Sequence, residues 1–411
     1  MRKINILFLV FFSLYNIAFS QNKEVISWLN DNAYSIENRS FNTDINIPEN
    51  QLSSSFSNAT VFGFGEATHH SKEFIQLKAK FFKYLVLIHN VKVFVLEESF
   101  GASYFVNEYI NGRGGDLKEI LLNFKQGIWK TQDLFELINW MKSYNVDKTG
   151  QEKIQFFGND CMFNYGLVSI INKIILDNGI ALKPNEKELL KFYENEISSY
   201  KDKKQLEFNA IEISKLKENL NSKINIFGLN NTLNALEYFN ELLINFDQQV
   251  RDKNMALSVI NFQSSLNNKV FVCAHNLHIK KTNIIKNTPS MGKLLYEKYR
   301  DLYFAVGFEF GIGRLFSYGN DDVILDQPIK NTNSEFLFEV NKDIFFFDFD
   351  IVNEDLNMKN FLNEKRDYVN IDGYGLILKY LKHNIHSEKY INNFDGLIYV
   401  KNISNSNFVK K

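Results

Sequence analysis

The segment TVFGFGEATHH, residues 60–70, decides the fold. Its first six residues form a short, mostly apolar run that does not alternate with polar positions, as is typical of a strand covered on both faces of a sheet. Four similar runs, rich in Val, Phe and Ile, follow at residues 92–96, 154–158, 269–274 and 302–308. Helical patterns at residues 72–89 and 131–144 lie between these runs. The alternation predicts an α/β fold of three layers, a mostly parallel sheet flanked by helices.

Residues 166–263 interrupt this alternation with long, charged amphipathic patterns, which predict helices at 187–217 and 233–262. Because strand and helix alternate again from residue 269, we interpret this stretch as a helical insertion within one domain of residues 21–411. Further strands are expected at residues 344–351 and 396–401.

The first 20 residues have the pattern of a signal peptide. A basic start, Met1-Arg2-Lys3, precedes an apolar stretch at residues 6–19, and Ala18-Phe19-Ser20 fits the rule of small residues before a cleavage site. The apolar stretch falls short of the roughly 20 residues that a transmembrane helix needs, which argues against the alternative of an uncleaved anchor. We therefore expect an exported protein, periplasmic or secreted, that has no membrane segment after cleavage.

Composition limits the partners of this chain. Its 47 basic and 48 acidic residues give a net charge of -1, so there is no electrostatic reason to expect nucleic acid or an anionic membrane as a partner. The two cysteines, Cys161 and Cys273, are too few for a disulfide framework or a cysteine-rich metal site. Each ends an apolar run, and buried free thiols are favoured over a disulfide between them.

A chemically capable side chain stands at or just after the last apolar position of each predicted strand. These side chains are Glu66, Glu97 with Glu98, Asp160, His275 and Glu309. In parallel α/β sheets the ligand crevice lies at the carboxyl ends of the strands. We therefore expect these residues to meet at one edge of the sheet.

Two of these strand ends carry a second functional residue three positions further on. Glu66 is followed by His69, and His275 by His278, a spacing that places both side chains on one face of a helical turn. A lone histidine is more often a packed core or surface residue than a catalyst. Four of the seven histidines fall in these two segments, which favours an acid–base site.

The acidic residues also have simpler interpretations. Glu97 directly continues its strand and is preferred for the site, whereas Glu98 fits a solvated strand end or a helix N-cap region. Asp160 is equally compatible with a helix N-cap.

Known nucleophile and phosphate motifs are absent from the sequence. It contains neither the G-x-S-x-G elbow nor a P-loop, and no G-x-G-x-x-G opens a helix after a strand. The remaining chemistry is water activated by histidine, or a metal held by histidines and carboxylates.

At these positions the sequence resembles the erythromycin esterase family, which includes succinoglycan-biosynthesis homologues. The matching segments occur in the order and spacing of the family over nearly the whole of residues 21–411. They are GEATHHSKEF (65–74), VFVLEESF (93–100), NEYINGRGGD (107–116), WKTQDLFELINWMKSYN (129–145), FFGND (156–160), RDKNMA (251–256), VCAHNLHI (272–279), SMGKLLYEKYRDLYFAVGFEFGIG (290–313) and FDGLIYV (394–400).

The resemblance implies hydrolysis of a macrocyclic lactone, as in a macrolide antibiotic such as erythromycin, without a metal or another cofactor. In this implied mechanism His69 is the general base on water. Its catalytic partners are Glu66, Glu97 and His275, of which His275 polarises the carbonyl or stabilises the oxyanion.

We expect substrate contacts from His278, Lys78, His70 and Asp160. His70 replaces the glycine usual after the motif histidine, and a bulkier residue there would narrow the pocket. Lys78 replaces an arginine, which keeps the charge but loses the two-pronged guanidinium. Two alternatives stay open on the residues alone: a metal-dependent hydrolase using the same Glu and His cluster, and a non-catalytic binder of a small ligand.

Overall fold

The computed structural model describes residues 22–37, 40–316, 322–371 and 384–410. The expected signal peptide, residues 1–20, lies outside them. Nine strands of the described chain form one sheet in the order β1-β10-β13-β8-β2-β5-β3-β4, with β9 paired to β8. These strands are β1 (Tyr34–Ser35), β2 (Val61–Phe64), β3 (Val91–Ser99), β4 (Gln155–Asp160), β5 (Lys269–Cys273), β8 (Tyr303–Leu315), β9 (Val323–Leu325), β10 (Ile344–Asp348) and β13 (Gly396–Ile403).

Neighbouring strands from β13 to β4 all run parallel, whereas β1, β10 and β9 join antiparallel. This arrangement confirms the predicted mostly parallel sheet. In β2, Phe62 and Phe64 belong to the core on one face of the sheet and Val61 to the core on the other. Both faces are therefore buried, which explains why the strand sequences lack polar alternation.

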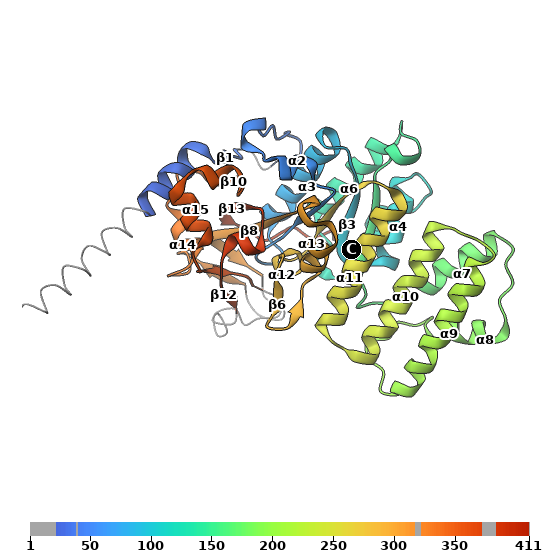
Figure 1. Ribbon diagram of the computed structural model, residues 1–411. Helices are drawn as coiled ribbons and strands as arrows, with labels where there is room; N and C mark the ends of the chain where they lie inside the picture. The colour runs from blue at the N-terminus through green and yellow to red at the C-terminus, as the bar shows by residue number, and fades with distance from the viewer. Residues whose placement is uncertain (1–21, 38–39, 317–321, 372–383, 411) are drawn as a thin grey trace, which may run out of the picture.

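Helices cover both faces of the sheet (Figure 1). The core on one face includes apolar residues of α3 (Lys72–Ile88) and α6 (Gln132–Asn145). The opposite core includes residues of α13 (Met291–Tyr299) and of the helices between β4 and β5. Other helices outside that stretch are α2 (Ser54–Asn58), α4 (Phe100–Ile110), α5 (Leu117–Leu122), α12 (Asn276–Ile279), α14 (Asn333–Phe338), α15 (Leu356–Asn363) and α16 (Tyr390–Asn393).

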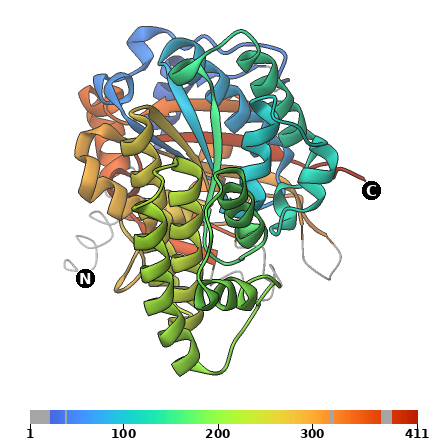
Figure 2. The ribbon, with the colours of Figure 1, turned by 90° about the vertical axis from the view of Figure 1, so that its right-hand side faces the viewer.

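Five helices occupy the chain between β4 and β5. They are α7 (Leu167–Asp177), α8 (Pro184–Phe192), α9 (Lys203–Asn221), α10 (Phe227–Asn245) and α11 (Gln248–Leu266). Figures 1 and 2 show α7 to α10 gathered at one end of the molecule, away from α14 and α15. The α11 helix returns the chain to the sheet, where it contacts β3, β4 and β5.

Two helix predictions in this stretch were wrong in extent. The expected helix 187–217 is interrupted between α8 and α9, and the expected helix 233–262 is interrupted between α10 and α11. At the second break Phe246 adopts the left-handed conformation, with φ 43°, and Asp247 then caps α11. A phenylalanine in this conformation is rare, so the only sequence signal at the break is Asp247, a residue type preferred at helix N-caps.

The strand expected at residues 302–308 is longer than predicted. β8 continues to Leu315, so Glu309 lies within the strand and not at its end. The strand continues because Phe308 and Phe310 face one core while Glu309 faces the other side of the sheet.

Two small two-stranded antiparallel sheets complete the fold. They are β6 (Asn283–Ile285) with β7 (Thr288–Pro289), and β11 (Arg366–Val369) with β12 (Ile385–Glu388). Beyond β11, Ile371 pairs with Thr68 and donates its backbone N–H to Ala67 O at 2.6 Å. The chain just after β11 therefore lies against the segment that carries Glu66 and His69.

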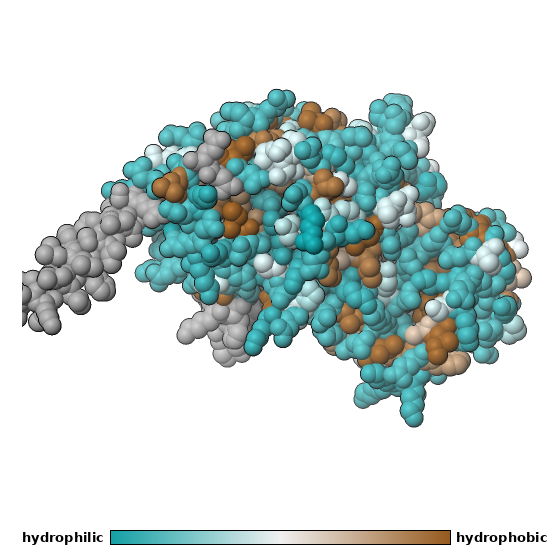
Figure 3. Space-filling model, viewed as in Figure 1, coloured by the Kyte–Doolittle hydropathy of each residue, from teal (hydrophilic) through white to brown (hydrophobic). Residues whose placement is uncertain are grey.

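The face drawn in Figure 3 is largely hydrophilic. Figure 3 shows apolar side chains in small separate patches, several of them over the helices between β4 and β5, where exposed large apolar residues include Leu176, Phe208, Ile211 and Phe246. Among the described residues, no helix is long and apolar enough to cross a bilayer.

Candidate active site

The carboxyl ends of four adjacent parallel strands bring the predicted side chains together. Glu97 lies near the end of β3, Asp160 ends β4, and His275 follows β5 as the N-cap of α12. The His275 backbone N–H donates to Glu97 Oε2 at 2.9 Å. The ring centroids of His275 and His69 are 5.0 Å apart. Residues distant in sequence thus form one cluster at the edge of the sheet, as the strand pattern predicts.

Glu66 lies at the centre of a buried acid–base triad. Its Oε1 is 2.5 Å from His69 Nδ1, and its Oε2 accepts a hydrogen bond from Lys78 Nζ, also at 2.5 Å. Burial alone would raise the pKa of Glu66, but Lys78 and His69 lower it to about 2. Glu66 is therefore a carboxylate at neutral pH. It accepts a hydrogen bond from the Nδ1–H of His69. His69 Nε2 therefore carries no proton and is able to accept one.

His275 is a hydrogen-bond donor, whereas His69 is a proton acceptor. As the N-cap of α12, its Nδ1 accepts a hydrogen bond from the Leu277 backbone N–H at 3.4 Å, so the ring proton is on Nε2. Nε2 is buried and has no hydrogen-bond partner among the residues that the structure describes. Burial lowers the pKa of His275 to about 3. The residue is thus a neutral imidazole with an unused N–H donor beside His69.

Arg251 on α11 connects three of the site's side chains. Its Nε and Nη2 donate to the two carboxylate oxygens of Asp160 at 3.0 and 2.9 Å, and Nη2 also donates to Glu97 Oε1 at 2.9 Å. Its Nη1 lies 3.3 Å from His278 Nε2. Burial would raise the pKa of Glu97, but His278 and Arg251 hold it well below its ordinary value. The guanidinium therefore keeps Glu97 charged in a buried site.

His278 pairs with Asp252, the residue after Arg251. Its Nδ1 is 2.9 Å from Asp252 Oδ1, which also accepts the Met291 backbone N–H at 2.8 Å. Burial alone would lower the pKa of His278, but Asp252 and Glu97 raise it above its ordinary value. Asp252 therefore fixes the ring and favours its charged form.

Sequence reasoning assigned no role to Arg251 or Asp252. Both lie on α11, many residues away in sequence from the end of any strand. The argument from strand ends therefore does not predict them. The available signal was the segment RDKNMA itself, which contributes adjacent charges to the buried face of α11.

Glu98 directly precedes Ser99, the N-cap of α4, so it lies in a helix N-cap region, but it is not solvated. Glu98 is fully buried and accepts backbone hydrogen bonds from Ser99 and Gln126, and burial raises its pKa to about 7. Asp160 is bound to Arg251 and also accepts a hydrogen bond from Gln126 Nε2 at 2.6 Å. It does not cap α7, because the N-cap of that helix is Gly166.

His70 lies beside the triad but packs among aromatic rings. Its ring centroid is 3.9 Å from that of Phe316 and 5.3 Å from that of Phe408. Burial lowers its pKa to about 4. His70 has φ 64°, in the left-handed region that favours glycine. A glycine, which the resemblance implies at this position, would adopt this conformation without steric cost.

Two of the four donors of the metal alternative are held by other groups. Glu66 is bound to His69 and Lys78, and His278 is bound to Asp252. Within the described ranges, no group of three or more His, Cys, Asp or Glu side chains is arranged to hold a metal. Cys161 and Cys273 are buried free thiols.

The fold and the site define an α/β protein with a histidine acid–base site at the carboxyl edge of its parallel sheet. Residues 87–403 match the family model described as erythromycin esterase. The chain belongs to the erythromycin esterase family. The matched range includes Glu97, Asp160, Arg251 and His275, and it begins after the segment that holds Glu66 and His69.

Similar proteins agree with this assignment. The chain is 25% identical over 293 residues to erythromycin esterase type II of Escherichia coli, which covers 60% of this chain and 68% of that protein. The crystal structure of a succinoglycan biosynthesis protein has a TM-score of 0.76 at 23% identity, covering 95% of this chain and 99% of that one. A mutant of the erythromycin esterase EreC in its open conformation has a TM-score of 0.58 at 18% identity, covering 86% and 93%. At these identities the two structures support the fold alone.

Proposed function

We propose that this protein is a carboxylic-ester hydrolase that opens a macrocyclic lactone, such as the ring of a macrolide antibiotic of the erythromycin type. Family membership supports hydrolysis, and the name of the Escherichia coli relative supports the lactone. The observation that carries the proposal is the Glu66–His69 pair with the unused Nε2–H of His275 beside it.

In the proposed reaction His69 Nε2 takes a proton from a water molecule, whose oxygen forms a bond to the lactone carbonyl carbon. Glu66 stabilises the imidazolium that results, because it is a carboxylate held 2.5 Å from Nδ1. The tetrahedral intermediate then expels the ring oxygen, and His69 returns the proton to it. The product is an open-chain hydroxy acid. Proton transfer by a placed histidine contributes about 10²–10⁴-fold to the rate.

His275 is the proposed donor to the oxyanion. A neutral Nε2–H in a buried position stabilises developing negative charge without giving up its proton, and such preorganised donors are worth about 10²–10³-fold in kcat. Its orientation depends on Glu97, which accepts its backbone N–H, and through Glu97 on Arg251. We therefore assign Glu97 and Arg251 as positioning residues.

The residues proposed to contact the substrate differ in whether their side chains are free to do so or are bound in internal ion pairs. His278 is a candidate for contact with the substrate, because its side chain is 9% exposed and lies against Glu97 and Arg251. Lys78 and Asp160 are bound in internal ion pairs, so we propose that they act through Glu66 and Arg251. We propose that His70 shapes the wall behind His69 through its stacking on Phe316.

The experiment is incubation of the purified protein with a panel of macrolides, followed by mass spectrometry of the products. We expect a gain of one water molecule for at least one lactone, and no gain with His69→Ala. His89→Ala is a matched control, because His89 caps the far end of α3, about 25 Å from its start. A panel that is recovered unchanged with the wild-type protein, or a His69→Ala variant as active as His89→Ala, contradicts the proposal.

We also propose that the protein is exported. The basic start and the apolar residues 6–19 support this. N-terminal sequencing of protein from the periplasmic or culture fraction should begin at Gln21, and recovery of intact Met1 in the cytoplasm would refute export.

A further inference from the structure

Asn276, the first residue of α12, is a buried amide to which the proposed reaction gives no role. It is 1% exposed. Its Nδ2 donates to the backbone oxygen of Phe308 at 2.8 Å, and its Oδ1 accepts the Phe308 backbone N–H at 3.1 Å. One side chain therefore pairs both main-chain polar groups of a residue in β8, as a neighbouring strand would.

β8 needs this partner because β2 ends before Phe308. The pairing of β2 with β8 stops at Phe64 and Val306, and the Gly65 N–H then donates to Val306 O at 3.0 Å. Phe308 lies two residues further along β8 and is fully buried. Buried main-chain groups without a partner are costly. The amide of Asn276 therefore takes the place that β2 has left beside β8.

The main chain of Asn276 is bound to the segment that carries Glu66 and His69. Its backbone N–H donates to Glu66 O at 3.0 Å. A methyl group added to Gly65 would lie 2.0 Å from Asn276 Oδ1, and the three atoms nearest to that methyl group all belong to Asn276. The two segments approach this closely because residue 65 has no side chain. Asn276 thus joins the Glu66 segment, the His275 segment and β8.

The position of α12 depends on such contacts because the helix has only four residues. A helix this short is not stable by itself, so contacts with the rest of the protein must hold it. The His275 N–H donates to Glu97 Oε2 at 2.9 Å, and the next residue, Asn276, makes its three hydrogen bonds to Glu66 and Phe308. These bonds fix the start of α12, where the ring of His275 lies.

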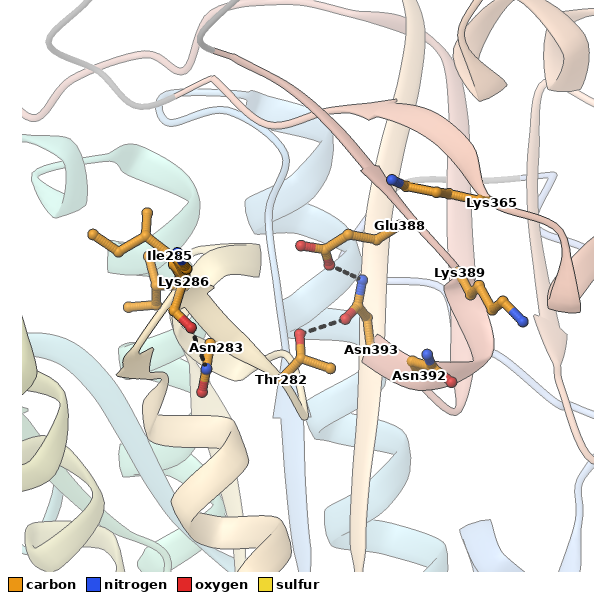
Figure 4. A pocket seen from close by; sticks show the side chains of 10 residues that line it. Thr282, Asn283, Ile285, Lys286, Lys365, Glu388, Lys389, Asn392 and Asn393 are labelled. Carbon is orange, nitrogen blue, oxygen red and sulfur yellow. Dashed lines mark hydrogen bonds between the residues drawn. The ribbon is translucent and has the colours of Figure 1, made fainter.

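The chain after α12 has anchors of its own. Thr282 Oγ1 donates to Asn393 Oδ1 at 2.6 Å, and Asn393 Nδ2 donates to Glu388, as Figure 4 shows at a surface groove of about 440 Å³. These bonds do not involve Asn276. Loss of the Asn276 amide should therefore release the start of α12, with His275, while the chain beyond the helix stays in place.

We propose that Asn276 is a positioning residue that holds the Nε2–H of His275 in its place beside His69, an inference that rests on the proposed lactone hydrolysis. The ring centroids of the two histidines are 5.0 Å apart. A donor to an oxyanion contributes only when it is aligned with the position that the oxyanion will occupy. Because this interaction forms in the transition state, loss of Asn276 should lower kcat and leave KM unchanged.

Asn145→Ala is the matched control for Asn276→Ala. Asn145 is 2% exposed, and its amide likewise binds the backbone N–H and oxygen of one residue, Ile154, at 2.7 and 2.9 Å. Ile154 directly precedes β4, about 20 Å from the end of that strand at Asp160. Both alanine variants should lose stability to a similar extent in urea unfolding, and only Asn276→Ala should lose activity.

The first measurement is the kinetics of both variants on any lactone that the wild type opens. We expect Asn276→Ala to lower kcat by about 10–10²-fold with KM changed by less than about twofold, and Asn145→Ala to leave both values unchanged. Equal effects of the two variants on kcat would overturn the inference, as would a loss that appears in KM alone.

Gly65→Ala is a second variant that displaces the same amide, and it keeps the test in force if Asn276→Ala does not fold. Its methyl group should push Asn276 Oδ1 away and lower kcat to a similar extent. The double variant Gly65→Ala/Asn276→Ala should lose little more activity than either single variant. Wild-type kcat in Gly65→Ala, or fully additive losses in the double variant, would contradict the positioning role.

An NMR measurement without substrate separates this inference from the proposed function. In protein with labelled histidines, we expect a nuclear Overhauser effect between the ring protons of His69 and His275. The effect should weaken in Asn276→Ala and persist in Asn145→Ala. An undiminished effect in Asn276→Ala would refute the positioning role and leave the proposed hydrolysis standing. A weakened effect in a protein that opens no lactone would refute the hydrolysis and leave the positioning role standing.

Discussion

Replacing Lys78 by Met tests the buried ion pair that holds Glu66 in its charged form. Methionine retains an unbranched apolar side chain but removes the ammonium group. Lys78 and Glu66 are 2% and 1% exposed, and their charged atoms are 2.5 Å apart. The lowering of the Glu66 pKa from 4.5 to about 2 corresponds to about 3 kcal/mol in favour of the carboxylate. Removing one partner of a buried pair typically costs about 3–5 kcal/mol, so we expect a loss in this range.

The pH dependence follows from the same shift. Because the pKa of Glu66 is lower in the folded state, the stability that it contributes is present above pH 4.5 and is lost as the pH falls toward 2. Lys78→Met should reduce this acid-sensitive component.

Urea unfolding, followed by fluorescence and by circular dichroism, measures the loss. The double variant Lys78→Met/Glu66→Gln should recover about 2 kcal/mol or more, because it no longer buries an unpaired charge. A cost below about 1 kcal/mol for Lys78→Met, or no recovery in the double variant, would refute this account of the ion pair.

Two further variants test the residues of α11. Arg251→Met leaves two buried carboxylates without their cation and should cost about 3–5 kcal/mol in urea unfolding, whereas Lys253→Met, which breaks a surface pair on the same helix, should change stability by less than about 0.5 kcal/mol. Equal effects of the two would remove the structural role of Arg251. Asp252→Asn should lower the pKa of His278, measured by NMR titration of the ring, because the charge that raises it is lost. An unchanged titration would assign the raised pKa to Glu97 alone.

Much of the sheet follows from local sequence. The apolar runs of β2, β3, β4 and β5 are short and flanked by helical patterns, so their positions and their common edge could be inferred. The convergence of Glu66, Glu97, Asp160 and His275 then follows from parallel strand order. The predicted range of β8 ended too early, because Glu309 interrupts the apolar run. Only the packing of the folded protein shows that a carboxyl group is buried within this strand.

The rest of the site depends on tertiary contacts that local patterns do not encode. Arg251 reaches Asp160 from a helix 91 positions further along the chain. The conformation of Phe246 that separates α10 from α11 has no sequence signature. The role of His275 depends on a proton placed by its N-cap hydrogen bond, which becomes visible only once the start of α12 is known.

The central claim is that His69 is the general base of a lactone hydrolase, and kcat/KM of His69→Ala on any lactone that the wild type opens tests it most directly. Circular dichroism and the activity of His89→Ala control for folding. We predict a loss of about 10²-fold or more for His69→Ala. A loss of less than about tenfold, roughly 1.4 kcal/mol of activation free energy, would show that His69 is not the base.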